Sequence, residues 1–314
     1  MPNIAQLYVL WLAMLLATIP PLFAQPNTEN PVGTAPTTLP DSLKGWKFGG
    51  AAGLNFSQTA LSNWAGGGQN SISIVGILNG FASFKQENFF WDNALELGLG
   101  AISVSGQTAP DFRKSDDKII FVSKAGLNAS SALSYALLLD FRTQFLDGFN
   151  FENRLPDGTF PVISRAFAPG YLVSSLGLDY HPVDFFSAFL APLSGRTIFV
   201  LDERLSAAGA FGVERTQRVR FDLGAALNVI FKKELIENIS YQSRLGIFAP
   251  YRELDRMIVS WENLLVLKVN KYVNVTWDVQ VFYDDRVVVL RNDGTTGPAT
   301  QFKSVLGVGI VYTF

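Results

Sequence analysis

The sequence contains no cysteine among its 314 residues. This absence excludes a lipoprotein anchor, structural disulfides, thiolate catalysis and zinc–thiolate sites. Charged residues make up only 17% of the chain, and a formal net charge of -2 offers no basic surface for nucleic acid. Beyond the N-terminus no apolar run reaches about 18 residues, so helical membrane spans are excluded. Aromatic residues are plentiful at 13%, which indicates a chain that faces an apolar medium without being helical.

The N-terminus has the pattern of an export signal. Residues 7–19 form an apolar core, and the small residue Ala24 follows shortly after it. This spacing predicts a secretory signal peptide over residues 1–24, although the first six residues hold no Lys or Arg. An uncleaved anchor helix is the alternative, but the apolar run is short for a membrane span. Residues 25–45 are rich in Pro, Thr and Asn and predict a disordered periplasmic linker.

From Trp46 onward, apolar and polar residues alternate with period two. In the segment 218–232 the odd positions are apolar, whereas the even ones include Arg220 and Asp222. The segments 134–147 and 272–284 repeat this pattern. Such alternation predicts strands with one apolar and one polar face, and runs of roughly ten to sixteen residues suit tilted membrane-crossing strands.

The connections between these segments alternate in length. Every second one is short, as in outer-membrane barrels, which have short periplasmic turns and long external loops. We therefore predict a single transmembrane antiparallel β-barrel of about twelve strands over residues 46–314. Ten or fourteen strands are the alternative, because the segment 184–216 is ambiguous, and a soluble β-sandwich ranks third. The predicted short turns lie near Glu87-Asn88, Ala132-Leu133, His181–Val183, Lys233–Glu237 and Asn270-Lys271.

The C-terminus ends in an aromatic–x–Phe pattern formed by Tyr312 and Phe314. This pattern resembles the signal by which outer-membrane barrels are recognised for insertion, although Gly307 stands where a polar residue is usual. We therefore expect the bacterial outer membrane as the location. The expected partners are the barrel-insertion machinery, outer-membrane lipid and lipopolysaccharide.

Charged residues at predicted inward positions carry both signs. In a wide pore they would line a water channel, whereas in a narrower barrel they would pair across the lumen and close it. A barrel of twelve strands is intermediate in width between eight-stranded barrels, which side chains fill, and sixteen-stranded barrels, which hold a water channel. Because the inward residues carry charges of both signs, we expect a mostly closed lumen. The predicted lumen-lining residues are Glu96, Lys124, Asp140, Arg142, Asp179, Arg218, Arg220, Asp222, Arg244, Glu262, Lys268 and Asp278.

No residue pattern points to catalysis, a cofactor or a metal. The one histidine, His181, precedes Pro182 in a predicted tight turn, and no Ser, Asp or Glu stands in a partnering pattern around it. The acidic pairs, such as Asp116-Asp117, lack the ligand spacing of a calcium loop. We therefore expect no enzymatic activity, no cofactor and no metal site.

Two long connections carry aromatic residues whose apolar rings would be exposed to water unless other groups bury them. Loop 148–170 contains Phe149, Phe151, Phe160 and Phe167, and we expect it to fold over the barrel mouth or to contact a partner or lipopolysaccharide. The connection 59–68 contains Asn63 and Trp64. Trp64 either turns inward at the mouth or faces lipid in the outer aromatic girdle.

The segment 54–74 reads LNFSQTALSNWAGGGQNSISI. It resembles the signature of a family of uncharacterised outer-membrane proteins from Bacteroidota, a domain of unknown function. The resemblance rests on Asn55, Phe56, Gln58, Asn63, Trp64, Gly67, Gly68, Asn70 and Ser71. It implies an exported outer-membrane barrel of that phylum and implies no activity.

Two functions remain from the sequence. The first is a non-catalytic structural or accessory component of the envelope with a largely charge-filled lumen. The second is a passive channel or transporter for a small or amphipathic solute. The mixed-sign interior favours the first.

Overall fold

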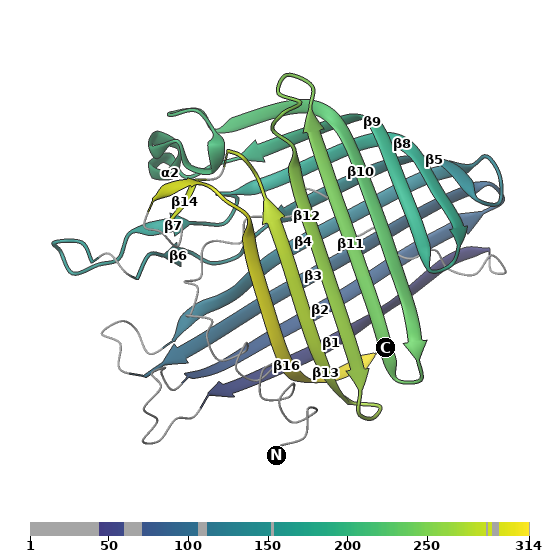
Figure 1. Ribbon diagram of the computed structural model, residues 1–314, viewed down its shortest axis with the longest axis horizontal. Helices are drawn as coiled ribbons and strands as arrows, with labels where there is room; N and C mark the ends of the chain where they lie inside the picture. The colour runs from purple at the N-terminus through teal and green to yellow at the C-terminus, as the bar shows by residue number, and fades with distance from the viewer. Residues whose placement is uncertain are drawn as a thin grey trace, which may run out of the picture.

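Twelve antiparallel strands close into one barrel in the computed structural model, as the sequence predicts (Figure 1). The structure describes residues 44–59, 71–105, 112–151, 154–286, 288–290 and 295–313. The barrel strands are β1 (Gly45–Thr59), β2 (Ser71–Gln86), β3 (Phe89–Val104), β4 (Arg113–Asn128), β5 (Leu133–Thr143), β8 (Gly170–Val183), β9 (Phe186–Phe199), β10 (Val219–Ile236), β11 (Ile239–Pro250), β12 (Ile258–Lys268), β13 (Val273–Tyr283) and β16 (Gln301–Thr313).

The alternation in sequence becomes an alternation of faces. Along β5, Ala136 and Leu138 point into the barrel and are buried, whereas their neighbours Tyr135 and Leu137 point outward and are exposed. Successive side chains of a strand point to opposite faces, so each strand supplies both surfaces. The outer surface is an apolar band of exposed Leu, Ile, Val, Phe and Trp side chains, which suits contact with lipid tails.

The two ends of the barrel differ. One end, the short-turn end, carries the tight connections between β2 and β3, β4 and β5, β8 and β9, β10 and β11, and β12 and β13. The other, the long-loop end, carries the small elements seen beside α2 in Figure 1. These are β6 (Gly148–Phe149), β7 (Val162–Ser164), α2 (Glu203–Ala208), η1 (Ala210–Gly212), β14 (Val288–Leu290) and β15 (Thr296–Pro298).

Helix α2 is short and has well-formed caps. The side chain of Asp202 accepts hydrogen bonds from the backbone N–H groups of Arg204 and Leu205, and Gly209 ends the helix with a φ of 71°. Among the described residues, no helix is long and apolar enough to cross a membrane.

Two predicted turns are misplaced. β8 continues through His181 and Pro182, because a break in register between Tyr180 and Val183 accommodates the proline. The turn therefore lies at the next two residues, Asp184 and Phe185. β10 extends through a similar irregularity at Glu234 to Ile236, so the turn there lies further along the chain than predicted.

Several predictions fall on residues that the structure does not describe. They are the signal peptide over residues 1–24, most of the predicted linker over residues 25–45, Asn63, Trp64 and Phe314. Tyr312 lies on β16 and points outward.

Outward-facing aromatic rings gather at the short-turn end of β1 to β3. Trp46 stacks on Phe48 with ring centroids 5.6 Å apart and also contacts Phe84 and Trp91. The indole N–H of Trp91 donates to the hydroxyl of Ser123 on β4 at 2.9 Å. A cluster of apolar rings in which an indole N–H has a hydrogen-bond acceptor is typical of a membrane–water interface.

The first and last strands close the barrel by a short seam. Among the described residues, β1 pairs with β16 at six positions, from Ala51 to Phe56, whereas its pairing with β2 extends over all fifteen residues from Gly45 to Thr59. Closure of the sheet leaves no free edge along those six positions.

Candidate functional site

The inner face of the barrel from β3 to β12, here the filled wall, carries buried charges in pairs. Lys124 of β4 and Asp179 of β8 form an ion pair across the intervening β5, with side chains only 4% and 1% exposed. Asp92 of β3 lies beside them and hydrogen-bonds to Ser83. A buried charge is costly without a partner, and here Lys124 and Asp179 neutralise each other within the filled wall near the short-turn end.

A second set of pairs lies toward the middle of the lumen. Arg142 and Asp140 occupy neighbouring inward positions of β5 and meet at 3.0 Å. Lys118 pairs with Glu96 at 2.5 Å, and Arg244 lies 3.8 Å from Glu262. The last two pairs each join neighbouring strands, β3 with β4 and β11 with β12, on opposite sides of the lumen.

The two sides also act on each other. Glu96 of β3 lies within electrostatic range of Arg244 on β11, and Lys118 of β4 lies within range of Glu262 on β12. The predicted charges Glu96, Arg244 and Glu262, together with Lys118, which the sequence prediction did not include, therefore form one set of alternating sign across the lumen. Asp278 of β13 belongs to the same set through Glu262 and Lys118.

An apolar cluster inside the barrel was not foreseen from the sequence. It joins inward side chains of eight strands, which pack together between the charged pairs. The signal was present, because Phe248 and Phe282 share the alternation of Arg244 and Asp278. The buried members are Phe90, Val122, Ala136, Leu138, Phe189, Ala191, Ala226, Phe248, Ile258 and Phe282.

Two predicted lumen-lining residues lie away from these pairs. Arg218 precedes β10, is half exposed and pairs with Glu203 of α2 at 2.8 Å, so it is not part of the barrel wall. Lys268 is exposed at the short-turn end of β12. His181 faces the lumen with its Nδ1 atom 3.9 Å from the Asp179 carboxylate. Within the described ranges, no three His, Cys, Asp or Glu side chains gather in a metal-binding group.

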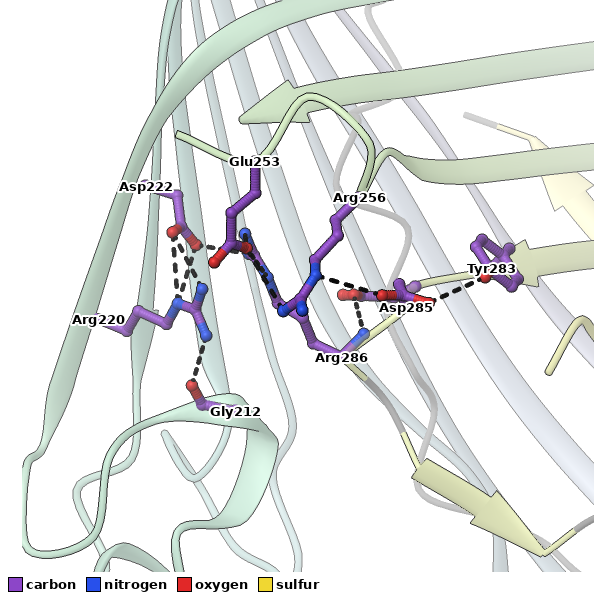
Figure 2. A network of polar contacts seen from close by, with 9 residues as sticks. Gly212, Arg220, Asp222, Glu253, Arg256, Tyr283, Asp285 and Arg286 are labelled. Atoms are coloured by element: carbon purple, nitrogen blue, oxygen red, sulfur yellow. Dashed lines mark hydrogen bonds and ion pairs between the residues drawn. The ribbon is translucent and has the colours of Figure 1, made fainter. Parts of the chain in front are cut away.

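The long-loop end carries an extended ion-pair network (Figure 2). Arg220 of β10 contacts Asp222 at 3.0 Å and donates to the carbonyl oxygen of Gly212 in η1 at 2.8 Å. Arg286, which follows β13, donates to Asp222 at 3.0 Å and to Glu253 at 2.7 Å. Here the mouth network means Arg220, Asp222, Glu253, Arg256, Asp284, Asp285 and Arg286 with their contacts.

The network ties three long loops to the barrel wall. Arg256 lies 3.4 Å from Asp285, whose carboxylate also accepts from the hydroxyl of Tyr283 at 3.1 Å. Asp284 accepts from the backbone N–H of Arg286 at 3.0 Å and faces Arg196 of β9 at 3.7 Å. Sequence reasoning found Arg220 and Asp222 by alternation but missed the loop residues, whose positions follow no period.

Two loop groups of the network have shifted pKa values. The hydrogen bond from Arg286 lowers the pKa of Glu253, and the charges of Arg286 and Arg256 add to this effect. Burial opposes the charge on Arg286, but its hydrogen bond to Glu253 and the charge of Asp222 raise its pKa. Both groups are therefore charged at neutral pH, as the network requires.

The inner face of β16, β1 and β2, here the open wall, differs from the filled wall. Phe81 shares the face of Ser83, and Val305 is paired in register with Asp278, so both point into the lumen. Phe81 is nevertheless 37% exposed and Val305 46% exposed. Solvent therefore reaches apolar side chains on the inside of the barrel.

Small residues leave this space. Gly49, Ala51 and Gly53 occupy successive inward positions of β1, and Gly307 does so on β16. Asn79 faces inward opposite Ala51 and is exposed. A large side chain at any of these positions would fill the space that the glycines and the alanine leave.

The phenylalanines of loop 148–170 pack on one another. Phe151 lies between Phe149 and Phe160, with ring centroids 6.0 and 5.1 Å apart, and the guanidinium of Arg113 lies over its ring at 4.6 Å. Phe167 packs instead against Phe141 of β5 at 6.0 Å. The β6–β7 hairpin holds the ends of this loop together.

Comparison with known proteins assigns no role. A family model described as a protein of unknown function (DUF3078) matches residues 56–149, less than half of the chain. This match supports the resemblance to a family of unknown function expected from the segment 54–74. No curated protein matches the sequence.

Solved outer-membrane proteins are similar at the level of the barrel. The COG4313 outer-membrane channel from Pseudomonas putida F1 is 12% identical, with a TM-score of 0.43, over 90% of this chain and 100% of that one. The TodX monoaromatic hydrocarbon channel (deltaS2 mutant) is 10% identical, with a TM-score of 0.36, over 89% and 92%. OmpT of Vibrio cholerae is 6% identical, with a TM-score of 0.35, over 86% and 99%. Likenesses at this level concern general architecture only.

Proposed function

We propose that this protein is a non-enzymatic outer-membrane barrel that gives small solutes passive passage along its open wall. The observation that carries the proposal is the asymmetry of the lumen. Inward side chains such as Phe81 and Val305 are accessible on one side, whereas Val122 and Leu138 are sealed on the other. Of the two functions expected from the sequence, this asymmetry favours the passive channel.

Several features support the outer membrane as the location. The outer surface is an apolar band, and Trp46 and Trp91 lie in an aromatic cluster at its short-turn end. The aromatic–x–Phe end at Tyr312 and Phe314 fits recognition by the barrel-insertion machinery. The resemblance of the segment 54–74 supports a source in Bacteroidota, where lipopolysaccharide would surround the external loops.

A structural or accessory role in the envelope is the second candidate. It is favoured by the mouth network, in which Arg286 joins loops of β11–β12 and β13–β14 to Asp222 of β10. Loops tied in this way present a fixed surface to a partner. The two candidates differ in one measurable respect, since only the first requires a continuous water path.

Two measurements test the channel. Purified protein in planar bilayers should show stable open conductance, and the cysteine-free chain allows single thiols to be placed at will. Val305→Cys should react with a charged, membrane-impermeant methanethiosulfonate in proteoliposomes. Leu306→Cys is the matched control, because it lies next in sequence but faces outward. Leu138→Cys tests whether the same reagent reaches a buried inward position of the filled wall. Absence of conductance together with an unreactive thiol at position 305 would reject the channel.

A further inference from the structure

Inward-pointing lysines lie at both ends of the lumen. At the short-turn end, Lys47 of β1 and Lys85 of β2 point inward, as do Lys232 of β10 and Lys268 of β12. Near the long-loop end, Lys303 of β16 points inward beside Gln280 and is exposed. A path along the open wall therefore passes cationic groups at both of its ends.

Most of these ammonium groups are not neutralised. Within the part of the chain that the structure describes, Lys47, Lys232 and Lys303 form no ion pair or hydrogen bond. The carboxylates near the short-turn end form no ion pair at contact distance with Lys47 or Lys232. Asp179 pairs with Lys124, and Glu234 accepts from the backbone N–H of Asn238, whereas Glu87, Asp184 and Glu237 are turn residues. Asp92 bonds to Ser83 and lies within electrostatic range of Lys124 and Lys85, so it offsets part of the charge of Lys85.

One lumenal carboxylate lies close to the path. Asp278 of β13 is within electrostatic range of Lys303, but it is also within range of Lys118 and of the like charge of Glu262. It makes no ion pair with a described residue at contact distance. Asp278 therefore weakens the positive potential near Lys303 without replacing it by a salt bridge.

The path between the lysines combines apolar and amide groups. Phe81 and Val305 offer exposed apolar surface, and Asn79 lies two residues from Phe81 on the same inward face. A fully hydrated inorganic ion gains nothing from the phenyl ring of Phe81. A molecule with a short apolar part and one anionic group would use the ring, the amide and the lysines together.

We infer that the open wall selects small amphipathic anions, such as short-chain carboxylates, as the solutes of the channel. This inference rests on the proposed passive channel and specifies its substrate class. The lysines set the sign of the selectivity, and the apolar surface at Phe81 and Val305 sets the preference for solutes with an alkyl or aryl part.

The first test measures ion selectivity from reversal potentials in a potassium chloride gradient across planar bilayers. We expect preference for chloride over potassium, and Lys303→Gln should lower the permeability ratio by about fivefold, equivalent to about 1 kcal/mol. Lys303→Glu should lower it further, and Asp278→Asn should raise it. Lys271→Gln is the control, because Lys271 lies over the ring of Tyr272 in the turn between β12 and β13, beyond the strands that enclose the lumen, and its loss should change nothing.

The second test uses octanoate and octylammonium as matched probes of opposite charge. Octanoate should interrupt the chloride current at concentrations at which octylammonium does not, and Phe81→Ala should weaken this block while leaving the chloride preference in place. A conducting protein that prefers potassium, or one blocked equally by both probes, would overturn the inference and leave the channel standing. A protein without conductance would instead reject the proposed channel itself.

Discussion

The guanidinium group of Arg286 lies 3.0 Å from the carboxylate of Asp222, although 64 residues separate them in the chain. Both side chains are largely buried, at 9% and 13% exposure. Through the same guanidinium, Glu253 of the β11–β12 loop is joined to the barrel wall. One arginine thus holds two long loops to an inward position of β10.

Replacing this arginine should release the β11–β12 loop. Arg286→Gln removes charge-assisted hydrogen bonds worth about 2 kcal/mol, or roughly thirtyfold in the local opening equilibrium. Trypsin should then cut the folded barrel faster after Arg252 and Arg256. In the control Glu203→Gln, which removes the exposed pair with Arg218, cleavage should stay at the level of the unmodified protein. Equal cleavage of Arg286→Gln and this control would show that the network does not hold the loop.

Acid should loosen the same loop. The pKa of Glu253 is lowered by Arg286, so the stabilisation is present above the ordinary value of 4.5 and is lost as pH falls through the lowered pKa. A spin label at Asp255→Cys should gain mobility only below that ordinary value. Glu253→Gln should be mobile at neutral pH already and should remove the part of the acid response that Glu253 causes. Loosening well above pH 4.5 would contradict this assignment.

The ion pair of Lys124 and Asp179 should show strong coupling. Lys124→Met leaves the Asp179 charge buried without its partner, and we expect a loss of about 3 kcal/mol in the free energy of unfolding. The double change Lys124→Met with Asp179→Leu should recover most of this loss, because no unpaired charge remains at position 179. Urea unfolding in lipid vesicles measures each variant, and Lys268→Met, at an exposed position, serves as control. Additive losses in the double variant would argue against the pair.

The stacked rings of loop 148–170 should protect it from proteases. In the unmodified protein, trypsin should cut slowly after Arg154, whose guanidinium lies 5.4 Å from the ring centroid of Phe160. Phe160→Ala removes the edge contact with Phe151, worth about 1 kcal/mol beyond its buried area, and should speed this cleavage several-fold. Rapid cleavage of the unmodified protein would show that the rings do not hold the loop.

Strand number and strand faces were predictable because period-two alternation and alternate connection lengths are local signals. The same local signals failed at Pro182, where the proline indicated a turn and the structure places it in an irregular strand end. Long-loop residues such as Arg286 follow no period, so no pattern placed them beside Asp222. The pairing of loops with the wall depends on the fold as a whole.

The lumen was only partly predictable for a related reason. Alternation identifies inward positions but not how full the lumen is at each strand. That depends on side-chain volume around the barrel, with Phe248 and Phe282 filling one side. Gly49, Ala51 and Gly53 leave the other side open, and their significance appears only when their strand is placed beside β16.

The six-position seam between β1 and β16 has a consequence for assembly. These strands lie at opposite ends of the barrel sequence, so bringing them together carries the largest loop-closure entropy of any pairing in the sheet. Hairpins between sequence neighbours form from local contacts and so precede it. We therefore expect the sheet before closure to have two unpaired edges, β1 and β16, and the pairing of those edges to be the last to form.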